Sequence, residues 1–474
     1  MAVVGLRLDT SVNFIAQTQI HAVFLCHGLW GRPEHMHTLR RVLQQRADST
    51  GHILEVHCCE SYSDVKTYDG VDVCADRVVE EIHSKIEDYR KASQEVRKFS
   101  ILGYSLGGLI ARLAVYILDK QGFFERIHPC NFTTVASPAL GVPITPGAVS
   151  SVMGAVSSFF LSRTGEQLYL KDKYSKSGKP LVEELASQEY LATLNKFEKI
   201  DVYANAVLDR VVPYLTGGID DSDPFLPALA KSGVFRAPAE QSVVIGDIEL
   251  TLDPKYPGLI SGVKNRPVPT REPKGSWEKP AFWISIKPWF SPSTYPFLPK
   301  PLDIGLVILI PTIIPPIILI LASFTFHRIA SFLRIRKHFR SNPSAADSER
   351  KSHPHFDLES QKTKVTKEQS NDSNQLSTLV SDAGTIAMDM VSSPTSDLEV
   401  GLDISGLHTG GSRPALHDPQ KSMALAIKAG LPKMKKHIAF FPGVFTSHKM
   451  IICQDERITE HKRGLDVINH CVDH

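Results

Sequence analysis

The chain has 474 residues, of which 42% are hydrophobic, so it can bury one large core or a few smaller ones. Lysine and arginine together number 53 and aspartate and glutamate 51, which leaves the chain near neutrality. This balance gives no reason to expect a nucleic-acid partner.

The seven cysteines are scattered along the chain. They show neither the paired spacing of a zinc site nor the dense spacing of a disulfide framework, so we expect reduced thiols and no bound metal. Residues 1–14, MAVVGLRLDTSVNF, lack the basic start and apolar core of a secretory signal. We therefore expect the folded part of the chain to lie in the cytosol.

Short apolar runs rich in β-branched residues alternate with longer amphipathic stretches over the first two hundred residues. In residues 71–88, for example, the apolar side chains recur near helical spacing with charges between them. Strands that alternate with helices predict an α/β fold, with a mostly parallel sheet covered on both faces. The predicted strands are residues 21–26, 52–59, 98–105, 131–137 and 199–207.

The first predicted strand ends in HGLWG, residues 27–31. Hydrolases that carry a serine on a sharp strand-to-helix turn place a second backbone N–H donor for the oxyanion in a loop of this kind. We expect the amide of Leu29 to be that donor and His27 to be structural. The alternative is that Gly28 and Gly31 only form a turn.

The segment Gly103-Tyr104-Ser105-Leu106-Gly107 matches the nucleophile elbow G-x-S-x-G. An apolar strand runs into it and the helix-like stretch LGGLIARLAVYIL leaves it, which is the context that the motif requires. The serine must occupy a strained turn, so the residues two positions on either side must be small. Ser105 is therefore the candidate nucleophile, and the amide of Leu106 is the candidate first oxyanion donor, against the alternative of a glycine-rich turn.

The strand at residues 199–207 leads directly to Asp209. In this order of elements the acid of a catalytic triad follows the nucleophile, on a loop after a later strand, and it orients the histidine base. Asp209 is the preferred acid. Asp220 and Asp221 are alternative acids. The non-catalytic alternative is that Asp209 is only a solvated aspartate on a loop.

The alternating pattern stops after Gly217. Residues 222–300 are rich in proline and aromatic residues, including Trp277, Trp283 and Trp289. An uncharged run, residues 304–326, follows and is long enough to cross a bilayer as a helix. Three prolines interrupt its centre: Pro311, Pro315 and Pro316. A basic cluster completes the segment 301–340 and consists of Arg328, Arg334, Arg336, Lys337 and Arg340.

Residues 341–432 are dominated by polar side chains with few aromatics over most of their length, and we expect them to form a disordered linker. Order is expected to resume at residues 433–474, with a strand at KHIAFFPGV and a helix at RGLDVINHCV. The base should lie on the loop between these two elements. Of the histidines in this region, His448 occupies that loop; the others are His437, His461, His470 and His474.

Several longer segments resemble the fungal putative serine esterases, a lipase-like α/β-hydrolase family. The resemblance is dense over residues 20–220 and looser over the last thirty, where His448 and Ile451 precede a G-x-x-V-I-x-H pattern, and it favours His448 as the base. The segments are HGLWG, GYSLGG, ASPALGVP, SRTGEQLYLKD and YANAVLDRVVPYLTGGI.

Within that family, the chain is most similar to the lipid-droplet phospholipases. This resemblance implies removal of acyl chains from glycerophospholipids with broad head-group tolerance, at a lipid droplet or at the cytosolic face of the endoplasmic reticulum. The chain departs from the family at Ala139, where relatives usually carry a histidine. A difference there can alter substrate preference without affecting the triad.

A triad of Ser105, Asp209 and His448 constrains the apolar run at 304–326, because a single crossing would leave His448 on the wrong side of a membrane. The prolines suit a bent hairpin that enters and leaves one leaflet. Tryptophans before the run and basic residues after it suit a lipid surface. A hairpin anchor is the preferred reading, and a single crossing and a soluble core helix are the alternatives.

The predicted organisation is an α/β-hydrolase core in two parts, 1–221 and 433–474, with a cap or interface segment (222–300), an anchor hairpin (301–340) and a disordered insertion (341–432) between them. The predicted function is a serine hydrolase, needing no cofactor, that cleaves acyl esters of glycerophospholipids. The alternatives are a neutral lipase acting on acylglycerols or sterol esters, and a hydrolase-like scaffold that binds lipid without catalysis. Residues 147–161, GAVSSVMGAVSSFFL, are a candidate lid or a plain packing helix.

Overall fold

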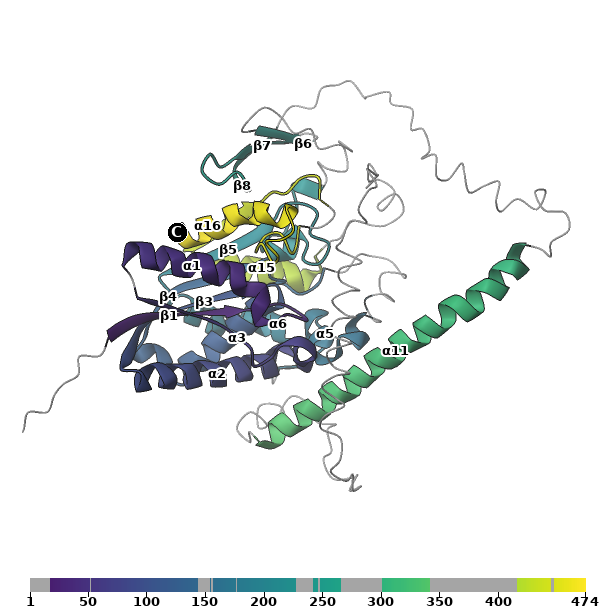
Figure 1. The fold of residues 1–474 in the computed structure, drawn as a ribbon, viewed down its shortest axis with the longest axis horizontal. Coiled ribbons are helices and arrows are strands. Elements are labelled where there is room, and N and C mark those ends of the chain that lie inside the picture. Colours follow the sequence, from purple (N-terminus) through teal and green to yellow (C-terminus); the bar gives the residue numbers. More distant parts are fainter. Residues whose placement is uncertain are drawn as a thin grey trace, which may run out of the picture.

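One nine-stranded sheet organises the molecule, with strands in the order β2-β1-β3-β4-β5-β9-β8-β7-β6 (Figure 1). The strands from β2 to β9 in this order pair in parallel, and β8, β7 and β6 extend the sheet with antiparallel pairs. The computed structural model describes residues 18–51, 53–143, 154, 157–175, 177–226, 242–245, 248–265, 301–341, 416–444 and 447–474, with side chains of the segment 301–341 only at 319 and 321–341.

The predicted α/β class is confirmed, and each of the five strands expected in the first 207 residues is present. Their apolar side chains alternate between the two faces of the sheet, as a strand buried on both faces requires. The strands are β1 (Thr18–Cys26), β2 (Leu54–Cys58), β3 (Gln94–Tyr104), β4 (His128–Val135), β5 (Lys199–Asn205), β6 (Ser242–Ile245), β7 (Ile248–Leu252), β8 (Leu259–Asn265) and β9 (Met434–Ala439).

Helices cover both faces of the sheet (Figure 1). In β1, Phe24 faces the core beneath α2 and α3, whereas Leu25 faces the core beneath α1 and α16. The helices are α1 (His37–Thr50), α2 (Val71–Lys91), α3 (Leu106–Lys120), α5 (Ser162–Leu168), α6 (Leu181–Leu185), α7 (Gln188–Leu194), α8 (Tyr214–Gly217), α11 (Pro301–Ser341), α15 (Asp418–Gly430) and α16 (Leu465–Asp473), with short 3-10 turns η1 (Pro33–Met36), η2 (Asp64–Asp69), η3 (Phe123–Glu125) and η4 (Glu460–Gly464).

Residues 242–265 were assigned to a separate segment by the sequence analysis, but they belong to the sheet. The strands β6, β7 and β8 form a meander that joins the parallel sheet where Leu259 and Ile260 pair with β9. Leu250 and Ile245 are fully buried in the core that this extension forms. The proline-rich composition of the wider segment concealed three short strands whose apolar alternation is confined to a few residues each.

The predicted end of the disordered segment, residue 432, is also wrong. Described structure resumes at Leu416 and includes the helix α15. The apolar residues Met423, Ala424 and Ile427 recur at helical spacing and are buried against the main core. His417 and Gln420 form a capping box at the start of this helix. The helix precedes β9, as a crossover between parallel strands requires.

The predicted hairpin is not present, since residues 301–341 form the single continuous helix α11 (Figure 1). A proline ring fixes φ close to the helical value, so a helix can continue through proline at the cost of a backbone hydrogen bond. Among the side chains that the structure describes, none of the helices combines the length and hydropathy needed to cross a membrane. The predicted tryptophan-rich flank, and the candidate lid before Ser157 apart from Gly154, lie outside the described residues.

Candidate active site

The candidate residues gather where parallel strands end at their carboxyl edge. The loop 27–31 follows β1, Ser105 follows β3, Asp209 follows β5, and His448 lies on the loop after β9. Because β1, β3, β5 and β9 run in parallel, their carboxyl ends meet at one edge of the sheet. In open α/β sheets, this is the edge at which ligands bind.

Ser105 has the strained backbone of a nucleophile elbow, with φ 54° and ψ −126° between β3 and α3. A non-glycine residue with positive φ is uncommon, and strain of this kind is concentrated at functional sites. The turn is also crowded: a Cβ at Gly107 would lie 2.3 Å from the carbonyl oxygen of Cys26, and one at Gly103 would lie 2.4 Å from that of Gly107. The two glycines of the motif are therefore required by close backbone approach.

The structure brings Ser105, His448 and Asp209 into one chain of hydrogen bonds. His448 Nε2 lies 3.0 Å from Ser105 Oγ, and His448 Nδ1 lies 2.9 Å from Asp209 Oδ2. Because an ionised carboxylate only accepts, Nδ1–H donates to Asp209 and Nε2 accepts from the serine hydroxyl. The side chains of His448 and Asp209 are 2% and 1% exposed. This is the geometry with which a histidine activates a serine.

The carboxylate of Asp209 is held from three further directions. Its Oδ1 accepts hydrogen bonds from the backbone N–H groups of Val211 (3.0 Å) and Val212 (2.8 Å). Its Oδ2 accepts one from Asn205 Nδ2 at 2.7 Å. These donors fix the orientation of the carboxylate toward His448 and stabilise its charge. The sequence analysis missed Asn205, although its place four residues before Asp209 was visible.

The loop that carries His448 is tied to the end of β5 and to the residue before the nucleophile. Ser447 Oγ donates to the carbonyl of Val207 at 2.8 Å, and its backbone N–H donates to Leu208 at 3.0 Å. The hydroxyl of Tyr104 donates to the carbonyl of His448 at 3.1 Å. Sequence gave no signal for Ser447, because these contacts join segments 240 residues apart.

The loop 27–31 packs directly against the nucleophile. A Cβ at Gly28 would lie 2.8 Å from the Cβ of Ser105, so only glycine fits there. Within the described residues, no acceptor is assigned to the backbone N–H of Leu29 or Leu106. Both N–H groups are therefore available to a developing oxyanion beside Ser105.

His27 is fully buried beneath this loop and stacks on Tyr62, with ring centroids 4.2 Å apart. Its Nδ1 lies 3.0 Å from the carbonyl oxygen of Gly28. Burial lowers the pKa of His27 to about 4, so the imidazole is neutral near pH 7. Its contacts hold the loop, in line with the expected structural role.

The alternative acids and bases have other partners. Asp220 forms ion pairs with Lys428 (2.6 Å) and Lys436 (2.9 Å), and Asp221 pairs with Lys428. Among the other histidines, His437 pairs with Asp201, and His470 Nδ1 lies 2.8 Å from the hydroxyl of Tyr203. His461 Nδ1 accepts from the backbone N–H of Asp455, and the ring of His474 stacks on that of His470.

The turn η2 connects the loop 27–31 to α11. The backbone N–H of Trp30 donates to Thr67 Oγ1 at 3.2 Å, and that of Asp64 donates to the carbonyl of Gly31 at 2.9 Å. On its other side, η2 contacts α11, where the rings of Tyr68 and His327 stack with centroids 6.1 Å apart. The candidate oxyanion loop is thus supported by a turn that the long helix also contacts.

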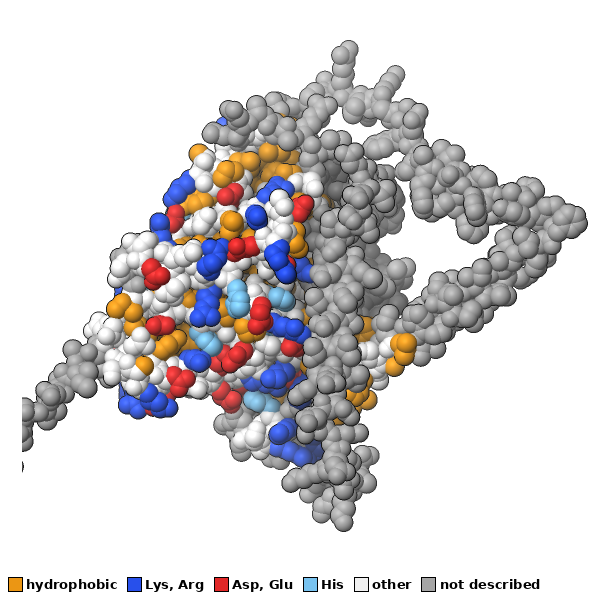
Figure 2. All heavy atoms as spheres, in the orientation of Figure 1, with side chains coloured by type: hydrophobic (Ala, Val, Ile, Leu, Met, Phe, Trp, Pro, Cys, Tyr) orange, Lys and Arg blue, Asp and Glu red, His pale blue; other side chains and the backbone are white. Residues whose placement is uncertain are grey.

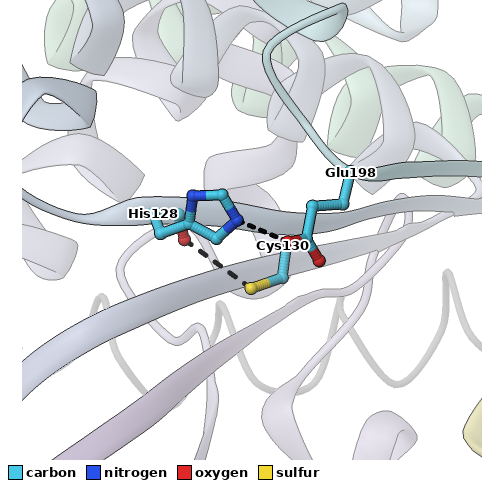
Figure 3. A group of neighbouring side chains, drawn as sticks. All are labelled: His128, Cys130 and Glu198. Atoms are coloured by element: carbon cyan, nitrogen blue, oxygen red, sulfur yellow. Dashed lines mark hydrogen bonds and ion pairs between the residues drawn. The ribbon is translucent and has the colours of Figure 1, made fainter.

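Among the described residues, one group has the spacing of possible metal ligands: His128, Cys130 and Glu198 (Figure 3). Their ligand atoms lie within 4.8 Å of one another, but His128 Nε2 and Glu198 Oε1 already form an ion pair at 2.6 Å, and both side chains are more than half exposed. The group lies where β4 and β5 begin, at the edge opposite Ser105. It takes no part in the site described above.

Comparison with known proteins agrees with this geometry. Residues 16–223 match the family described as "Putative serine esterase (DUF676)". The matched stretch includes Ser105 and Asp209 and ends before His448. Three fungal relatives are "Putative lipase ROG1" of Saccharomyces cerevisiae (35% identical over 156 residues, 32% of this chain and 22% of the relative), "Putative lipase YDL109C" of the same yeast (37% over 127 residues, 26% and 19%) and "Putative lipase C4A8.10" of Schizosaccharomyces pombe (33% over 130 residues, 26% and 16%).

The chain therefore spans about a fifth of the length of the first two fungal relatives, 22% and 19%. Similar solved structures include phospholipase PlaB of Legionella pneumophila, 18% identical with a TM-score of 0.30, covering 42% of this chain and 41% of that one. Another is a putative cell surface hydrolase of Lactobacillus plantarum, 15% identical with a TM-score of 0.25, covering 42% and 75%. Likenesses at this level carry no argument about function.

Proposed function

We propose that the protein is a lipase-type serine hydrolase that cleaves acyl esters of glycerophospholipids at the surface of a lipid droplet or of the endoplasmic reticulum. The observation that carries the proposal is the hydrogen-bonded chain from Ser105 through His448 to Asp209. The serine esterase family of residues 16–223 supports the reaction type.

In this reaction, Ser105 Oγ attacks the acyl carbonyl while His448 Nε2 takes the hydroxyl proton. The amides of Leu29 and Leu106 hold the oxyanion, and each such donor contributes about 3 kcal/mol to stabilisation of the transition state. His448 returns the proton to the leaving alcohol, a lysophospholipid, which leaves an acyl-enzyme. Water, deprotonated by His448, then releases the fatty acid and restores the serine hydroxyl.

The long helix supports the lipid surface as the place of reaction. Its described part exposes six large hydrophobic side chains, which are Leu319, Leu321, Phe326, Ile329, Phe332 and Leu333. Some of this apolar surface is visible in orange at the position of α11 (Figure 2). Exposed apolar patches mark interaction sites. The preceding residues 304–318 are uncharged, and the helix extends away from the sheet at this end (Figure 1).

A single embedded helix also keeps the triad on one side of the lipid. The strand β8 ends on the sheet at Asn265, and α11 rejoins the hydrolase core through its second half, where Arg328 Nη2 lies 2.9 Å from Glu166 Oε1 of α5. The intervening chain thus leaves and returns to the same body. Such a helix can lie within a droplet monolayer or one leaflet without crossing, and its exposed Lys337 and Arg340 can bind anionic head groups.

The test compares the full-length protein with Ser105→Ala on phospholipid-coated triacylglycerol emulsions, with the products identified by mass. The proposal predicts serine-dependent release of fatty acid and lysophospholipid. Serine-dependent loss of triacylglycerol alone would instead assign a neutral lipase. Equal product from both proteins would contradict catalysis by Ser105 and favour a lipid-binding scaffold.

A further inference from the structure

Arg112 is a buried cation that the proposed reaction does not use. It lies on α3, two turns beyond Ser105, and is 5% exposed. Its Nε and Nη2 atoms are fully buried and have no acceptor among the described residues. Buried arginine is almost always paired, because an uncompensated charge in the interior costs several kcal/mol.

The guanidinium lines a cavity of about 20 Å³ between α3, the sheet and α15. None of the described residues that line it is acidic, and their polar side chains other than Arg112 are the hydroxyls of Thr134 and Ser137. Ala139 also lines the cavity. The remaining wall is apolar and is formed by α3, β4, β5 and α15, with Leu109, Phe132, Val202 and Ile427 among its residues.

The charge of Arg112 persists despite this environment. Burial lowers the pKa of Arg112 to about 10, and no acidic neighbour acts on it, so the guanidinium stays protonated at pH 7. A neutral ligand would leave the charge uncompensated. The size of the cavity also favours a small ligand, because a space of this volume holds about one water-sized particle.

We propose that this cavity is a site for a small monovalent anion, chloride, bound by the Nε and Nη2 groups of Arg112 and by the hydroxyls that line it. The anion would join α3, which carries the nucleophile, to β4 and α15 on the far side of the elbow. The site is distinct from the triad and does not depend on the proposed reaction.

The first test measures thermal unfolding of the full-length protein in sodium chloride and in sodium gluconate at equal ionic strength. Gluconate is too large for the cavity. Chloride at about ten times its Kd should raise the Tm of the natural protein by roughly 2 °C over gluconate. Arg112→Met, which replaces the cation by a shorter, unbranched apolar side chain, should have the same Tm in both salts. Equal Tm values for the natural protein, or an equal chloride effect in Arg112→Met, would overturn the proposal.

A second test does not depend on a variant that folds. Crystals of the natural protein grown in sodium bromide should show an anomalous peak within hydrogen-bond distance of Arg112 Nε, because bromide replaces chloride at such sites. Electron density for water alone in the cavity, without an anomalous signal, would contradict the proposal.

Discussion

Arg334 and Asp69 are 265 residues apart in sequence and joined by a two-pronged ion pair. Arg334 Nε lies 2.9 Å from Oδ2, and Nη2 lies 2.7 Å from Oδ1. The Asp69 side chain is completely buried and also accepts a hydrogen bond from Arg77 at 2.8 Å. Since Asp69 closes η2, and η2 supports the loop 27–31, the pair connects the long helix to the proposed oxyanion site.

Replacing Arg334 by alanine should release the second half of α11 from the hydrolase core. Arg77 remains to pair with Asp69 and Arg334 is partly exposed, so we expect a loss of about 1–2 kcal/mol in stability, less than for a fully buried pair. Activity on lipid emulsions should fall more than activity on a soluble short-chain ester, and trypsin should cleave residues 319–341 faster. The matched control is Arg340→Ala on the same helix, whose side chain is exposed. Identical behaviour of the two variants would show that the ion pair does not hold the helix.

Asn205 should act as a positioning residue for Asp209. The variant Asp209→Asn should have a kcat about ten-thousandfold lower, because His448 then loses the carboxylate that orients it. Asn205→Ala removes one of the groups that hold this carboxylate and should lower kcat by about 10–100-fold, the value of a hydrogen bond to a charged group. KM should change little, since Asn205 does not face the substrate.

The control for Asn205→Ala is Asn195→Ala, because the Asn195 side chain donates to the carbonyl of Gly430 far from the triad. Steady-state kinetics on a soluble ester separates kcat from KM for each variant. A raised KM with unchanged kcat in Asn205→Ala would contradict the positioning role.

Gly107→Ala should disrupt the elbow. The added Cβ would meet backbone oxygens of both Cys26 and His27, at 2.3 and 2.5 Å, and neither can move without displacing β1. We expect a loss of roughly 1–3 kcal/mol or more from overpacking, together with loss of activity. In Gly262→Ala, the new Cβ makes only ordinary contact with Thr251 at 3.8 Å, so stability should change little. An active, stable Gly107→Ala protein would rule out the close approach described here.

Stability should fall on acidification through His27. Its pKa is about 4 in the folded protein and 6.5 when unperturbed, so between these values the unfolded chain holds a proton that the folded chain does not. By linkage, the free energy of unfolding decreases as pH falls through this window, by on the order of 3 kcal/mol in total. Above pH 6.5 His27 is neutral in both the folded and the unfolded chain, so the free energy of unfolding is no longer reduced by its protonation.

Denaturant titrations from pH 7 to pH 4 should therefore give a shallower loss of stability for His27→Asn than for the natural protein. The control is His83→Asn, because His83 is exposed. If His27→Asn and the natural protein lose stability in parallel, His27 is not buried in its neutral form.

Local sequence signals were sufficient for Ser105 and Asp209. The elbow is defined by five consecutive residues between a strand and a helix, and Asp209 is placed by the strand before it. His448 needed the order of elements and the family resemblance, because several histidines compete in the same region. Ser447 could not be found, since its contacts with Val207 and Asn205 span about 240 residues, whereas Asn205 lies only four residues before Asp209 and was overlooked.

The errors in the fold have a common physical origin. Composition predicted disorder up to residue 432, but the three apolar residues that bury α15 are too few to alter the average of a long polar segment. Prolines at 311, 315 and 316 predicted a bend, yet each removes one backbone hydrogen bond from a helix that spans 41 residues. In α15 the average composition of a long segment concealed a short helix, whereas in α11 the local effect of three prolines was too small to interrupt a long helix.

The most direct test of the account is labelling of the full-length protein with a fluorophosphonate, followed by peptide mapping by mass spectrometry. The account predicts one covalent adduct on Ser105, and its loss in His448→Ala at equal folded fraction, because Ser105 is nucleophilic only with its base. A folded natural protein that shows no adduct on Ser105, or one labelled equally in His448→Ala, would contradict the catalytic role of this serine.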